Sequence, residues 1–61
     1  MEKTKNEMAR VVVQALFNLK ELPDKNYRYV KRYERLNKDR LVKDYTYALS
    51  ILKGEKQNEN E

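Results

Sequence analysis

Five basic residues recur at helical spacing in the middle of the chain, and their side chains are of the kind that binds phosphate. They are Arg28, Lys31, Arg32, Arg35 and Lys38. Steps of three and four residues place side chains on one face of a helix, where like charges repel by about a few tenths of a kcal/mol per pair. A phosphate backbone would offset that repulsion, and arginine adds bidentate contacts to phosphate or guanine. The pattern predicts a nucleic-acid-binding face.

The excess positive charge lies in one segment. The 61 residues include 14 Lys or Arg and 10 Asp or Glu, a formal net charge of +4. Residues 25–43 hold eight basic and two acidic residues, whereas residues 1–24 are neutral. We therefore expect Arg40 and Lys43 to extend the phosphate contact. The alternatives are a solvated face that binds nothing and a face that steers the chain toward an acidic partner protein.

Five of the aromatic residues are tyrosines. Tyr27 and Tyr47 lie off the apolar stripes of the expected helices, so either could stack on bases or on partner side chains. Tyr29, Tyr33 and Tyr45 are expected at the rim of the core, with packed rings and hydrated hydroxyls.

Residue types that carry catalysis or bind metals are scarce. The chain has no His and no Cys, which removes the commonest general base, the most nucleophilic side chain and the ordinary zinc ligands. Its single Gly cannot form a glycine-rich phosphate loop. We expect no enzyme activity, no catalytic residues, no metal, no cofactor and no small-molecule substrate.

Three helices are expected to position the basic residues. Apolar residues recur at three- and four-residue steps, which is typical of amphipathic helices. The expected helices span about 5–21, 24–36 and 38–53, an all-α three-helix domain over residues 1–53. One kinked helix over 24–53 is the competing arrangement.

Several residues mark the expected helix ends. They are Thr4 with Glu7 at the first start, Pro23 at the second, Asn37 or Asp39 at the third, and Gly54 at the last end. The polar residues 54–61 are expected to form a disordered tail.

An alternative places a strand in the first segment. Val11, Val12 and Val13 are β-branched and favour a strand. A strand over residues 10–17 followed by two helices would resemble the ribbon-helix-helix repressors, dimers that read DNA with paired strands. Residues 10–17 lack strict polar and apolar alternation, so we favour the helix. A helix-turn-helix pair formed by 24–36 and 38–53 is another arrangement.

A second apolar strip predicts self-association. Val13 and Phe17 lie beside the main stripe of the first helix, and Ile51 lies off the stripe of the last. Because an apolar patch on a small protein often marks a contact site, we expect a homodimer through these residues. The other interpretation is that the third helix wraps far enough to cover them.

No apolar run approaches the roughly 20 residues of a membrane span, and no signal-peptide pattern is present. We expect a cytoplasmic protein without membrane association, of the kind found in bacteria or phages. Its expected function is regulation through binding of nucleic acid, DNA in the first place. The alternative is an inhibitor or adaptor that binds a partner protein through an apolar and tyrosine surface.

Overall fold

The computed structural model describes residues 3–59 and the side chains of residues 3–54. It consists of α1 (Lys5–Asn18), α2 (Tyr27–Glu34) and α3 (Lys38–Glu59). No strand occurs within residues 3–59, and residues 10–17 are helical. The prediction of a small all-helical domain with three helices is confirmed. The competing single helix over 24–53 is wrong, because α2 and α3 are separate.

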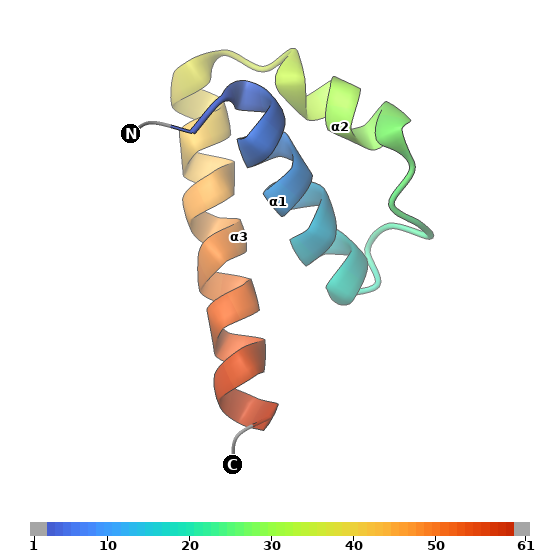
Figure 1. Ribbon diagram of the computed structural model, residues 1–61, viewed down its shortest axis with the longest axis vertical. Coiled ribbons are helices and arrows are strands. Elements are labelled where there is room, and N and C mark those ends of the chain that lie inside the picture. Colours follow the sequence, from blue (N-terminus) through green and yellow to red (C-terminus); the bar gives the residue numbers. More distant parts are fainter. Residues whose placement is uncertain (1–2, 60–61) are drawn as a thin grey trace.

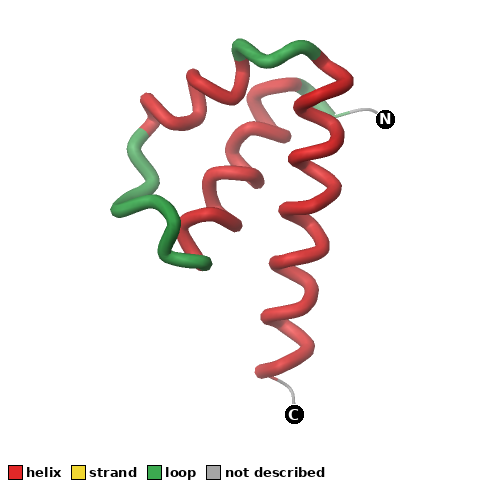
Figure 2. The backbone as a smooth tube through the Cα atoms, turned by 180° about the vertical axis from the view of Figure 1, so that it is seen from behind, coloured by secondary structure: helices red, strands yellow, loops and turns green. Residues whose placement is uncertain are grey.

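α1 lies between the other two helices (Figures 1 and 2). α2 and α3 each pack on α1 and scarcely contact one another. The molecule measures 37 × 28 × 16 Å, and one helix with its side chains is about 10–12 Å across. The three helices therefore form a flat, open arrangement, and part of α1 stays uncovered between its neighbours.

The larger apolar cluster joins α1 to α3. Its buried members are Met8, Val12, Ala15, Leu41 and Ala48. Leu41 is completely buried, so it is the central contact of α3 on α1. Tyr45 and Leu52 of α3 pack against the same cluster, as the apolar stripe predicts.

The smaller apolar cluster joins α1 to α2. Ala9 and Val13 of α1 contact Val30 of α2, and Leu22 and Tyr29 pack against them. Val13, expected on an exposed strip, is only 2% exposed. The helix that covers it is α2, not the third helix.

The start of α1 agrees with the predicted capping box. The Thr4 hydroxyl accepts a hydrogen bond from the Glu7 amide at 3.2 Å, and the Glu7 carboxylate accepts one from the Thr4 amide at 3.5 Å. Together these bonds satisfy backbone donors that the first turn leaves unpaired.

The end of α1 differs from the prediction: the helix stops at Asn18 and does not reach residue 21. The Glu21 amide donates to the Leu16 carbonyl and the Lys20 amide to the Phe17 carbonyl, both at 2.9 Å. Lys20 has a φ of 64°. These are the features of a Schellman motif, in which glycine usually takes the left-handed position. Lysine stands there in this chain, so the sequence carries no visible stop signal.

The start of α2 also differs from the prediction. Pro23 does not open the helix, which begins at Tyr27. The Asp24 carboxylate accepts a hydrogen bond from the Asn26 amide at 2.8 Å, and the Asn26 side chain accepts one from the Arg28 amide at 3.0 Å. Asn26 is therefore the N-cap, and the connection is longer than expected.

α3 begins as predicted and ends later. The Asn37 side chain accepts a hydrogen bond from the Arg40 amide at 2.9 Å, which identifies Asn37 as the cap. The predicted stop at Gly54 is wrong: the helix runs to Glu59, and Gly54 does not adopt a positive φ. Residues 60–61 of the predicted tail lie outside the described residues. Among residues 3–59, none of the helices has both the length and the apolar character needed to cross a membrane.

Candidate nucleic-acid interface

α2 separates apolar and basic side chains onto opposite faces. Val30 is buried against α1, and Tyr29 and Tyr33 are half-buried beside it. Each predicted cation of α2, and Arg35 just after it, is exposed. Burial of Val30 therefore fixes which face of the helix points outward.

The basic side chains of this outward face converge on one place. Arg28, Lys31, Arg32 and Arg35 line a shallow depression of about 290 Å³, called here the basic depression. No carboxylate lines it. Four cations around one hollow create a local positive potential that favours an anionic ligand.

Arg28 is additionally oriented by its neighbour. Its Nη2 donates a hydrogen bond to the Tyr29 hydroxyl at 3.3 Å, and its guanidinium lies 5.1 Å from the centre of the Tyr29 ring. The hydrogen bond to Tyr29 raises the pKa of Arg28. Arg28 is thus a permanent cation in a restrained position.

Glu34 is the single acidic residue of α2, and it is held away from the basic depression. Its Oε2 accepts a hydrogen bond from Asn6 Nδ2 at 3.2 Å, in a partly buried contact with α1. Asn6 therefore keeps the carboxylate on the α1 side of the helix. This contact between distant segments leaves the basic face without an opposing charge.

The remaining predicted cations lie elsewhere. Lys38, Arg40 and Lys43 are exposed on the first two turns of α3, and none of them lines the basic depression. Arg40 forms an ion pair with Asp44, with 3.7 Å between Nε and Oδ2. The structure therefore brings together four of the seven predicted phosphate-binding residues.

The two tyrosines predicted to stack are both exposed but lie in different surroundings. Tyr27 is 50% exposed, and the cationic groups of Arg10 and Lys31 each lie 6.0 Å from its ring centre. Because Lys31 also lines the basic depression, Tyr27 adjoins it. Tyr47 is 62% exposed on α3 and belongs to a second concave surface.

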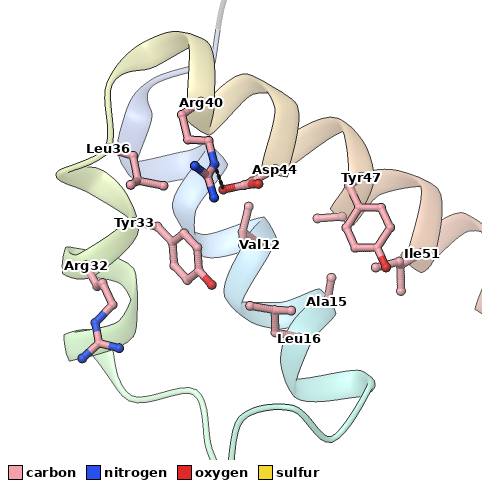
Figure 3. A pocket seen from close by; sticks show the side chains of 11 residues that line it. Val12, Ala15, Leu16, Arg32, Tyr33, Leu36, Arg40, Asp44, Tyr47 and Ile51 are labelled. Atoms are coloured by element: carbon pink, nitrogen blue, oxygen red, sulfur yellow. Dashed lines mark ion pairs between the residues drawn. The ribbon is translucent and has the colours of Figure 1, made fainter.

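That second surface is a groove of about 320 Å³, and no pattern in the sequence indicates it. α1 forms its floor, while α2 with Leu36 and α3 form its walls (Figure 3). Its aliphatic lining residues are Val12, Ala15, Leu16, Leu36, Ala48 and Ile51, and its polar or aromatic ones are Arg32, Tyr33, Arg40, Asp44 and Tyr47. We refer to it as the interhelical groove. The sequence pattern assigns several of the aliphatic residues, among them Val12 and Leu16, only to the hydrophobic core.

Tyr33 stands in the α2 wall of the interhelical groove, facing the α3 wall across the floor (Figure 3). Burial raises the pKa of its hydroxyl, and the nearby Asp44 carboxylate raises that pKa further. The group is therefore a neutral hydrogen-bond donor at and above neutral pH.

The residues predicted to form a dimer interface do not share one surface. Phe17 is 36% exposed with Lys25 Nζ 5.3 Å from its ring centre, whereas Ile51 lines the interhelical groove. Val42 and Leu49, at 40% and 43% exposure, are seven residues apart and so share one side of α3.

Residues 3–59 contain no group of three or more His, Cys, Asp and Glu side chains that could hold a metal ion. Comparison of the chain with known proteins gives no match to a protein-family model, a curated protein or a solved structure.

Proposed function

We propose that this chain is a small regulatory protein that binds nucleic acid, DNA in the first place, through the outer face of α2. The observation that carries the proposal is the basic depression: four exposed cations from one helix face surround a hollow that no carboxylate lines. Asn6 supports it, because its hydrogen bond keeps Glu34 on the α1 side.

The binding energy on this proposal comes mainly from phosphates. Lys31 acts as a point charge, while the three arginines add forked donors that match two phosphate oxygens at once. Tyr27 provides an exposed ring beside the depression on which a base or sugar can pack. Arg10, over the same ring, adds a cation from α1.

A salt titration tests the proposal. If four groups meet phosphates, the slope of log K against log[salt] should be about −4 on duplex DNA, because each contact contributes about −0.9. Replacing Arg28 and Arg35 together by Gln should reduce the slope to about −2. The fold should survive, since both side chains are exposed.

The matched control replaces Lys5 and Lys53 by Gln. It removes the same charge from exposed positions outside the basic depression, so the slope should change far less. Equal losses in the two variants would show a diffuse charge effect and no site. No binding to a 20-base-pair duplex at micromolar protein and about 50 mM salt would end the proposal.

A homodimer is part of this proposal, on a different surface from the one first expected. Val13 is buried in the chain, whereas Val42 and Leu49 leave an apolar strip on α3 uncovered. A second copy that packs on this strip would bury its apolar side chains. Leu49→Asp should lower the sedimentation mass from dimer to monomer. A monomer mass for the unmodified chain at high micromolar concentration would contradict the dimer.

A further inference from the structure

The interhelical groove has the composition of a binding site for an apolar group. Its floor and lower walls carry six aliphatic side chains without a hydrogen-bonding group. Its volume of about 320 Å³ falls within the range of about 300–1,000 Å³ that is typical of ligand sites. It is open because α2 and α3 flank α1 without closing on each other.

The rim of the groove carries a guanidinium group on each of two sides. Arg32 stands at the outer edge of the α2 wall and Arg40 on the α3 wall (Figure 3). Asp44 is the single carboxylate among the lining residues, and it is paired with Arg40. The rim therefore keeps a net positive charge, which is complementary to an occupant that is both apolar and acidic.

The length of the groove suits a short helix. Along α3 its lining residues run from Arg40 to Ile51, a distance of about 16 Å at the helical rise of 1.5 Å per residue. That distance corresponds to about three turns of a helix, which leaves room for apolar anchors at i, i+4 and i+7, since these span about 10.5 Å.

We propose that the interhelical groove binds an acidic amphipathic helix of a partner protein. Apolar side chains of that helix enter between Tyr33 and Tyr47, and its carboxylates pair with Arg32 and Arg40. An unstacked base is the less suitable occupant, because the aliphatic floor offers its polar edge neither donors nor acceptors.

The position of Arg32 couples this site to the nucleic-acid surface. Arg32 lines both the interhelical groove and the basic depression. A carboxylate of the partner helix and a phosphate would compete for the same guanidinium, so the partner displaces nucleic acid. This coupling, unlike the groove site itself, rests on the proposed function.

The probe is a random 12-residue peptide library displayed on phage and selected against the immobilised full chain. We expect the enriched peptides to combine Asp or Glu with apolar residues at helical spacing. No enrichment, or enrichment of peptides without acidic residues, would overturn the proposal.

Two variants of α3 provide the decisive comparison. Thr46 and Tyr47 are neighbouring exposed residues of α3, yet only Tyr47 lines the groove. Tyr47→Asp should weaken binding of a synthetic consensus peptide by about tenfold or more, whereas Thr46→Asp should leave it unchanged. Circular dichroism checks that both variants fold, and both are measured at a concentration where they are monomeric. Equal effects of the two substitutions would overturn the groove assignment. The assignment would also be overturned if an oligothymidine displaced the peptide under conditions where a duplex did not.

The competition arm uses the same peptide and a 20-base-pair duplex. In the unmodified chain the apparent dissociation constant of the peptide should rise as duplex is added. If both ligands bind together, the coupling through Arg32 is wrong. The peptide assay without DNA tests the groove site alone. The salt titration of the Arg28/Arg35 variant without peptide tests the proposed function alone, so the failure of one can be told from the failure of the other.

Discussion

The basic depression and the interhelical groove are adjacent surfaces of different origin. One helix supplies the depression: α2 presents Arg28, Lys31 and Arg32, and Arg35 follows directly after it. Three helices supply the groove, whose floor belongs to α1 and whose walls belong to α2 and α3. A surface made by one helix depends mainly on residue spacing, whereas a surface made by three depends on how the helices pack. The two should therefore respond differently to changes in the core.

The largest effect should come from Leu41, which holds α3 on α1. Replacing this fully buried side chain by Ala should cost about 2–5 kcal/mol. That is comparable with the whole stability of a domain this small, at about 0.05–0.15 kcal/mol per residue. Urea unfolding should show most of the stability lost. Lys53→Ala, at an exposed site on the same helix, is the control and should change stability by less than about 0.5 kcal/mol. Similar losses at both positions would contradict the α1–α3 packing.

A smaller effect should follow from Val30, which holds α2 on α1. Val30→Ala removes two buried methyl groups and should cost about 2 kcal/mol. Because an isolated eight-residue helix is unstable in water, α2 should loosen first. Hydrogen exchange should then accelerate in α2 more than in α1 and α3, and duplex affinity should fall although no cation is changed. Equal acceleration in all three helices would show that α2 does not open separately.

The contact between Asn6 and Glu34 tests whether the basic depression depends on keeping this carboxylate away. Asn6→Ala removes the hydrogen bond that holds the Glu34 carboxylate, at a cost of about 1 kcal/mol in stability. The released carboxylate is then free to approach Lys31 and Arg35, its neighbours along the helix, and duplex affinity should fall a few-fold. Adding Glu34→Gln to this variant should restore the affinity. If the second substitution does not restore it, Glu34 does not act on the basic depression.

The smallest effect concerns Tyr33 and alkaline pH. Since the folded chain raises the pKa of Tyr33, the unfolded chain loses this proton first, near the ordinary value of about 10. The stabilisation that the raised Tyr33 pKa provides is fully present below pH ~10. It is lost as the pH rises above that value toward the raised pKa of the folded chain. Tyr33→Phe should remove this part of the decline, which urea unfolding at about pH 8 and pH 11 measures. Parallel declines in the two proteins would mean that the Tyr33 pKa is not raised.

The sequence predicted what local spacing determines. The three helices, the capping box at Thr4 and the four cations of the basic depression all follow from residue type and interval. For the same reason the opposite apolar face of α2, with Val30 and Tyr33, was predictable.

Features that depend on tertiary contacts were not predictable. Lys20 takes a left-handed conformation that the sequence would assign to glycine, so the end of α1 was placed too late. Val13 is covered by α2 because the connection between α1 and α2 brings that helix back along α1. The spacing of residues within α1 does not indicate this contact. The interhelical groove exists because α2 and α3 stay apart on α1, which is a property of packing alone.

The most direct test of the central claim is the response of the amide resonances of the full chain to a short DNA duplex. If α2 carries the nucleic-acid contact, the largest shifts should lie at Tyr27 and at residues 28–35, and Ile51 and Tyr47 should move little. If the largest shifts instead fall on the first turns of α3, around Lys38 and Lys43, with α2 unchanged, the basic depression is not the binding site.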